Sequence, residues 1–170
     1  EQLIADGCVL ISQHADTTGA PTACEAKKVP CVGYNIDMIP TAPDAALTSA
    51  TINWGPYYTY AVQSVIDGTA IETDWAKGVK DGADAITELN DKTVAEGTKE
   101  AVEEAQKGIE DGTLHVFDTS TFTVDGKELT TYKKDGSDTE YVSDGYFHES
   151  EYGSAPAFDV AIDGITSITE

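Results

Sequence analysis

Two short apolar runs near the start of the chain, at residues 8–12 and 30–34, both stop abruptly at polar residues. Between them, residues 18–28 have a composition that suits a helix, with Pro21 placed for a first turn and two lysines near the end. Parallel strands need a crossover of about a dozen residues, so this segment predicts a strand–helix–strand unit with parallel strands. An architecture of the α/β class follows from that unit.

The polar residues that follow the two runs are candidate ligand-binding residues. Parallel strands end at one edge of their sheet, and open α/β sheets bind small molecules at that edge. We therefore expect the topology to bring four side chains together: His14, Asp16, Thr17 and Asp37.

Charge excludes one class of partner. The 170 residues include 31 acidic and 10 basic side chains, a formal net charge of −21, and every basic residue is a lysine. Without arginine the chain has no guanidinium group for bidentate phosphate or base contacts, and its negative charge repels polyanions. We expect no nucleic-acid partner. The length suits one domain of ordinary size, or one lobe and a piece of another, and is enough to bury a sizeable core.

Three cysteines cannot all pair within one chain, and their apolar settings do not suggest a metal site. We expect buried thiols at Cys8 and Cys31 in the strands, with Cys24 on the helix facing the sheet. Neither a cofactor nor a metal is expected.

The first seven residues are typical of the end of a helix closed by Gly7. We therefore expect the sequence to be part of a longer protein whose upstream half, including any targeting segment, lies outside it. No apolar run approaches the ~18 residues of a membrane-spanning helix.

Further along the chain, patterns of both helix and strand occur. The helix that follows Trp54 is the clearest, because Pro56 suits its first turn and Gly68 its end. The expected elements are a loop at 38–44, a strand at 47–53, the helix up to 67, a strand, turn and extended segment within 74–89, an amphipathic helix at 93–110 and a hairpin turn at 124–127.

Five motifs carry a resemblance to a known family. They are SQHADTT at 12–18, VGYNIDM at 32–38, NWGPYY at 53–58, VIDG at 65–68 and GVKDG at 78–82. In order and spacing the chain resembles the basic membrane protein family, the PnrA-like substrate-binding lipoproteins of bacterial ABC transporters. The resemblance covers about residues 1–118.

The resemblance implies a type I periplasmic-binding-protein fold, with two lobes of Rossmann-like parallel sheet flanked by helices and a ligand cleft between them. Residues 1–118 would be mainly the second lobe and its crossover segments, and 119–170 a β-rich and loop-rich extension. The implied ligand is a purine nucleobase or nucleoside, adenine-like in this case. The implied partners are the missing N-terminal lobe of the same protein and an ABC permease, and the implied location is outside the cell membrane on a lipoprotein anchor.

The resemblance also implies residue roles. Asp37 matches the strand-end aspartate that accepts hydrogen bonds from the ligand. Asp16 and Thr17 match the strand-to-helix turn that lines the cleft. Trp54 matches the aromatic residue at the start of the hinge-side helix, and Lys80 matches the lysine of a Lys-acid-Gly turn.

Each of these residues also has a purely structural interpretation. Asp37 can cap the loop that follows it. Trp54 can pack beside its neighbouring tyrosines, and His14 can be a hydrogen-bonded residue at the strand edge. Lys80 can pair with a surface acid.

Three other functions stay open at this stage. The same fold can hold a sugar or a signalling molecule, can act as a receptor lobe for another protein, or can carry an α/β enzyme that acts on nucleosides. We expect no enzyme, because Ser12, His14 and Asp16 alternate along a strand without forming a triad, and no nucleophile elbow or phosphate loop is present.

Overall fold

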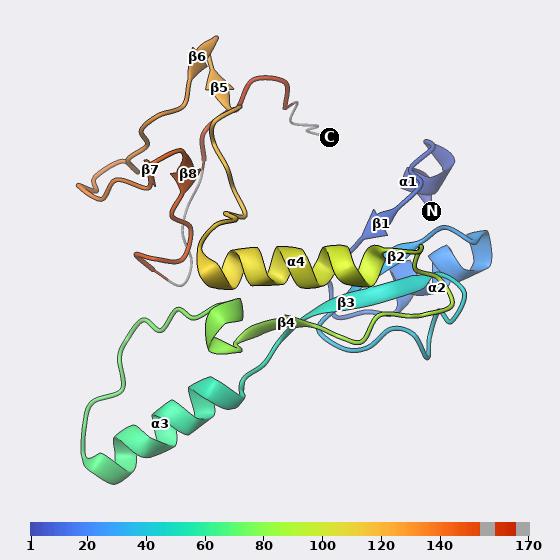
Figure 1. Cartoon of the computed structure of the whole chain (residues 1–170), viewed down its shortest axis with the longest axis horizontal. Helices are drawn as coiled ribbons and strands as arrows, with labels where there is room; N and C mark the ends of the chain where they lie inside the picture. The colour runs from blue at the N-terminus through green and yellow to red at the C-terminus, as the bar shows by residue number, and fades with distance from the viewer. Residues whose placement is uncertain (154–158, 166–170) are drawn as a thin grey trace.

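A four-stranded sheet forms the centre of the computed structural model, which describes residues 1–153 and 159–165. The strand order is β1-β2-β3-β4 (Figure 1). β1 (Ile11–Ser12), β2 (Cys31–Tyr34) and β3 (Ala46–Ile52) are parallel, and β4 (Asp84–Ile86) is antiparallel to β3. The predicted α/β class and the parallel strand–helix–strand unit are confirmed.

Helices connect and flank these strands. α1 (Gln2–Ala5) precedes β1, and α2 (Gly19–Lys27) crosses from β1 to β2 and packs on β2 and β3. α3 (Gly55–Asp67) follows β3 and ends at Gly68 in the left-handed conformation, as predicted. α4 (Thr98–Asp111) lies along the sheet in Figure 1, whereas α3 projects away from it.

Three expectations about local structure are wrong. The first apolar run forms only a two-residue edge strand, which leaves Val9 81% exposed and Cys8 exposed as well. The segment 74–89 has no strand before its turn, because Val79–Asp81 forms the short 3₁₀ helix η1. α4 begins five residues after the expected position 93, because the residues before it form a turn held by Asn90.

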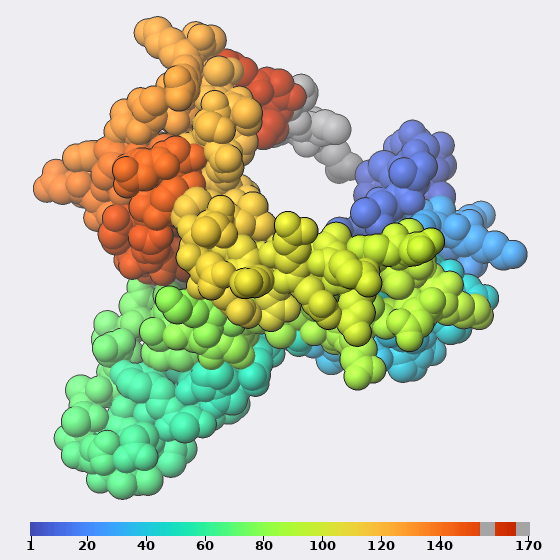
Figure 2. All heavy atoms as spheres, in the orientation of Figure 1, coloured from blue at the N-terminus to red at the C-terminus, as the bar shows by residue number. Residues whose placement is uncertain are grey.

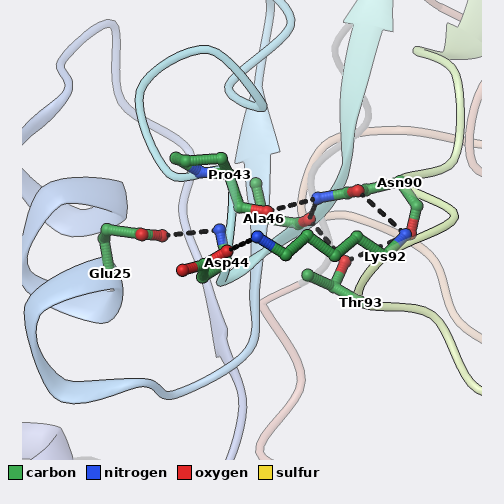
Figure 3. Close-up of polar contacts among 7 residues, drawn as sticks. All are labelled: Glu25, Pro43, Asp44, Ala46, Asn90, Lys92 and Thr93. Atoms are coloured by element: carbon green, nitrogen blue, oxygen red, sulfur yellow. Dashed lines mark hydrogen bonds and ion pairs between the residues drawn. The ribbon is translucent and has the colours of Figure 1, made fainter.

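The side chain of Asn90 links two loops at the amino ends of the strands (Figure 3). Its amide Nδ2 donates hydrogen bonds to the carbonyl oxygens of Pro43 (3.1 Å) and Ala46 (2.8 Å). The Thr93 hydroxyl donates to the same Ala46 carbonyl at 2.8 Å. Buried backbone carbonyls need such partners, so these bonds hold the turn before α4 against the start of β3. Two further interactions lie next to these bonds. Lys92 forms an ion pair with Asp44, and the Asp44 backbone amide donates a hydrogen bond to the Glu25 carboxylate.

The core beneath the sheet is small. It consists of six buried side chains, with Met38 the largest of them, so the expectation of a sizeable core is not met by the described residues. Cys24 and Cys31 are buried in it as predicted. Burial, and then the neighbouring Cys24 thiol, raise the pKa of Cys31 to about 12, so this thiol stays protonated. The six are Cys24, Cys31, Met38, Ala42, Ala45 and Ala46.

The C-terminal part of the chain forms a second, separate cluster. Two hairpins build it: β5 (Thr123–Val124) with β6 (Lys127–Glu128), and β7 (Val142–Ser143) with β8 (Tyr146–Phe147). The hairpin turn expected at 124–127 is confirmed. Positions 154–158 and 166–170 of the expected β-rich extension lie outside the described residues. The centre of the cluster is Leu129, Val142 and Phe147.

Figure 2 shows α3 and the segment after it as an arm that projects from the body of the molecule. In the part of the chain that the structure describes, no helix combines the length and apolarity needed to cross a bilayer.

Gly33 provides a first test of this packing. A Cβ atom there would lie 2.3 Å from the Ser49 hydroxyl and 2.6 Å from Met38 Cγ, and both of these side chains are buried. We expect Gly33→Ala to lower the free energy of unfolding by about 1–3 kcal/mol through overpacking. Gly19→Ala is the matched control, because the nearest atom to its added Cβ is 3.5 Å away. Urea unfolding measures both, and an equal stability of the two variants would contradict the packing described.

Candidate functional site

Polar side chains follow all three parallel strands at their carboxyl ends. His14 and Asp16 follow β1, Asn35 and Asp37 follow β2, and Trp54 follows β3. The side chains of all except Asn35 are exposed, so they are accessible to a ligand. The topology therefore assembles the predicted residues along one edge of the sheet.

Asn35 ties the three strand ends together, and sequence reasoning did not select it. Its side-chain Nδ2 donates to Asp16 at 3.1 Å, and its backbone amide donates to the Ala50 carbonyl at 2.6 Å. The Thr51 hydroxyl donates to the Asn35 carbonyl at 2.7 Å. Asn35 also has φ 67°, a left-handed conformation that asparagine tolerates better than most residues. The sequence feature that could have identified Asn35 is an asparagine directly after a predicted strand.

Asp37 has the capping role that was weighed as its structural interpretation. Its Oδ1 accepts a hydrogen bond from the Ile39 backbone amide at 2.9 Å, while Met38 between them is buried in the core. The carboxylate itself stays exposed at the edge. Capping thus orients Asp37 outward and leaves its side chain accessible to solvent.

His14 and Thr17 line the strand-to-helix turn after β1. The His14 ring lies over Tyr34 with ring centroids 4.3 Å apart, so it packs across the ends of β1 and β2. The Thr17 hydroxyl accepts a hydrogen bond from the Gly19 amide at 3.2 Å, at the first residue of α2. Local contacts therefore orient both residues, and both remain exposed.

Asn53, the residue before Trp54, bonds to the end of the turn that carries Lys80. The Asn53 side chain donates to the Gly82 carbonyl at 2.9 Å, and its backbone amide donates to Ala83 at 2.7 Å. The turn that carries Lys80 therefore lies beside the start of α3. Among the described residues Lys80 makes no ion pair; the neighbouring Lys77 pairs with Asp81 instead, at 3.6 Å.

An aromatic cavity of about 260 Å³ opens beside Trp54. The Trp54 ring contacts Tyr57 edge-on at a centroid distance of 6.2 Å, and Tyr57 contacts Trp75 at 5.3 Å. Asp84 at the start of β4 and Ser150 from the C-terminal region also line it. Sequence reasoning found Trp54 but missed Trp75, Asp84 and Ser150, because they come from segments 20 or more positions away.

Two carboxyl groups near this cavity have perturbed acidity. Burial raises the pKa of the Asp84 carboxyl above its usual value. Burial also raises the pKa of Glu149, and the negative charge of Asp84 raises it further. Like charges at one site disfavour ionisation of both groups. Neither carboxylate has a hydrogen bond or ion pair to any other described residue.

A buried histidine positions the segment that carries Glu149 and Ser150. His148 lies 6% exposed after β8. Its Nε2 is 2.9 Å from the Ser143 hydroxyl, and its Nδ1 is 2.8 Å from the Glu151 carboxylate. These bonds tie the residues after β8 to β7, so the Glu149–Ser150 pair is held between two anchored positions. The described residues contain no cluster of three or more His, Cys, Asp or Glu side chains suited to a metal ion.

Comparison with known proteins identifies relatives of the chain. Residues 1–114 match the sequence model of the Bmp family, described as ABC transporter substrate-binding protein PnrA-like. The purine-binding protein BAB2_0673 of Brucella abortus (strain 2308) is 32% identical over 126 residues. That match covers 74% of this chain and 35% of the relative, so the chain spans about a third of the length of the curated relative it matches.

One of the solved structures compared shares the fold. A transcriptional activator of the comK gene from Bacillus halodurans superposes with a TM-score of 0.59 at 14% identity, over 68% of this chain and 41% of that one. An ABC transporter solute-binding protein from Conexibacter woesei matches with a TM-score of 0.49 at 18% identity, over 68% and 39% of the two chains.

Substitutions at Asn35 test its role at the strand ends. Asn35→Gly removes the amide but accepts the left-handed backbone, whereas Asn35→Ala also strains it. We expect the alanine variant to unfold more easily than the glycine variant by about 1 kcal/mol, with the wild type the most stable. Chemical denaturation gives this order; an alanine variant as stable as the glycine one would show that the left-handed conformation is not maintained.

The pKa shift at Glu149 predicts a pH-dependent stability. A carboxyl group whose pKa is raised on folding destabilises the fold while it is ionised, and this effect disappears as pH falls through the folded pKa toward the unfolded one. We expect Glu149→Gln to raise the melting temperature at pH 7–8 and to match the wild type near pH 4. Glu128→Gln, at an exposed position in the same region, is the control. A difference from wild type that stays constant across this pH range would contradict the shift.

Proposed function

Because the chain belongs to the PnrA-like (Bmp) family of ABC transporter substrate-binding proteins, we propose that its protein captures a purine nucleobase or nucleoside and delivers it to a membrane permease. One observation carries the choice of ligand: a relative at 32% identity is a purine-binding protein. An adenine-like base is the ligand we favour. Family members are binding proteins rather than enzymes, so the proposal contains no chemical step.

The proposed ligand site is the carboxyl edge of the sheet. Its support is the position of the candidate residues, which lie exposed at the ends of neighbouring strands, where open α/β sheets bind small molecules. Carboxylates accept hydrogen bonds from ring and exocyclic N–H groups, and an aromatic side chain stacks on the base. The residues proposed to contact the ligand are Asp37, Asp16, Thr17, His14, Trp54 and Lys80.

A second lobe of the same protein is part of the proposal. The purine-binding relative is far longer than this chain, and α3 carries a row of exposed apolar side chains. Val62 is 59% exposed, and Val65 and Ile66 are each 71% exposed. Soluble proteins cover such contiguous surfaces. We assign this face of α3 to the contact with the N-terminal lobe, which would close over the ligand by hinge motion. The protein would work outside the cytoplasmic membrane, held by a lipid anchor upstream.

Ligand binding by the full-length protein tests this function. Isothermal titration with adenine, adenosine and hypoxanthine is expected to show binding of at least one purine, and ribose serves as the non-purine control. Asp37→Asn removes a charged acceptor and is expected to weaken purine binding about tenfold or more. Asp111→Asn changes the charge equally at an exposed position at the end of α4 and should leave binding unchanged. Binding of ribose without any purine would redirect the assignment to a sugar receptor.

A further inference from the structure

The cavity beside Trp54 has the composition of a site for a flat ring. Both tryptophans of the chain, Trp54 and Trp75, line it together with Tyr57. The aromatic contacts between them hold the rings at fixed angles, with Tyr57 and Trp75 meeting edge-on at 67°. Aromatic side chains of this kind stack on the flat face of a heterocycle and stabilise its binding.

We propose that this cavity is the seat of the base, that the Asp84 carboxylate accepts hydrogen bonds from an amino group on it, and that Ser150 closes the site. The inference rests on the proposed function and deepens it, because it names the residues that would select an amino-substituted heterocycle. Asp84, Trp75 and Ser150 are additional to the six residues proposed for the carboxyl edge, and Trp54 is common to both sets.

The size of the cavity favours a nucleobase over a larger ligand. Its volume of about 260 Å³ is just below the roughly 300 Å³ at which pockets for drug-sized molecules begin. Its polar side chains are Asn53, Lys77, Asp84 and Ser150, and Asp84 is the acid among them. Polar groups beside aromatic rings orient a ligand that the rings hold by stacking.

The electrostatics of Asp84 favour a ligand that brings N–H groups. Asp84 and Glu149 interact as like charges, and burial raises the pKa of both. Neither group is hydrogen-bonded or ion-paired within residues 1–153 and 159–165. Asp84 is exposed on β4, and a carboxylate without a hydrogen-bond partner gains from an N–H donor. An amino group supplies that donor, whereas an oxo group facing Asp84 presents a second acceptor and is disfavoured there; the Lys77 side chain in the same lining is paired with Asp81 at 3.6 Å.

Ser150 makes the C-terminal region a component of this site. It lies between two cavities: the aromatic one and an adjacent one of about 280 Å³ that Glu149 lines. The residues that match the family end at position 114, so this wall is outside the matched part of the chain. The bonds of His148 to Ser143 and Glu151 hold the segment in place. Selectivity for the base would thus depend on a segment that the family motifs do not include.

Tryptophan fluorescence of the full-length protein gives a direct readout. Titration with adenine is expected to quench emission, and Trp75→Phe is expected to remove part of that quenching and to weaken binding about tenfold. Asp84→Asn is expected to weaken adenine binding about tenfold or more while changing hypoxanthine binding less, so that the preference for adenine falls. Ser150→Tyr fills the cavity and is expected to block both ligands.

Matched variants separate the possible results. Asp111→Asn and Thr121→Tyr make the same chemical changes at exposed positions that do not line the aromatic cavity, and melting temperatures verify that every variant is folded. If adenine binds and Asp37→Asn weakens it, but Asp84→Asn and Ser150→Tyr behave like their controls, this inference is overturned and the proposed function stands. If the wild-type protein binds no purine, the proposed function fails and this inference fails with it.

Discussion

The hydrogen bonds of Asn35 are the interaction on which the candidate site depends. One residue in a left-handed conformation bonds to the turn after β1 through its side chain and to the end of β3 through its backbone. The strands themselves are short, with β1 only two residues long, so backbone pairing alone leaves their ends loosely defined. Asn35 adds the cross-links that short strands lack. The positions of Asp16 and Asp37 relative to each other follow from it, and so does the geometry of any ligand contact at this edge.

The buried apolar side chains of the described residues form two small clusters, and two carboxyl groups with a raised pKa come one from each part of the chain. Asp84 belongs to the sheet and Glu149 to the C-terminal region, and the charge of one raises the pKa of the other. The chain has a net charge of −21, and carboxylates that stay solvated lower the free energy of unfolding very little. The Asp84 and Glu149 carboxylates have no hydrogen-bond or ion-pair partner among the described residues, and the exposed Asp84 lines the cavity with the three aromatic rings. Carboxyl groups with perturbed pKa values that line a cleft are typical of functional sites, and this supports the proposal that the cavity binds a ligand.

Several elements were predictable from local sequence, and others were not. Pro56 and Gly68 mark the ends of α3 because proline and glycine act through backbone geometry, which is a local property. The failures have a different cause. Residues 8–10 suit a strand, but the position at the edge of the sheet leaves Val9 in solvent. The helical pattern from 93 onward gives way to a turn because Asn90 bonds to loops more than 40 positions earlier. Burial and long-range hydrogen bonds have no signature in a short window.

The sequence by itself determined the α/β class, the parallel unit and the identity of the polar residues at the strand ends, because all of these depend on periodicity, crossover length and motifs read along the chain. Its motifs also predicted the family to which the chain belongs. Only the tertiary structure decided which residues surround Trp54. Trp75, Asp84 and Ser150 reach the same cavity from three separate segments, and a C-terminal hairpin anchored by His148 supplies one of its walls. Such a convergence is a property of three-dimensional packing, since residues far apart in the chain become neighbours only when the chain folds.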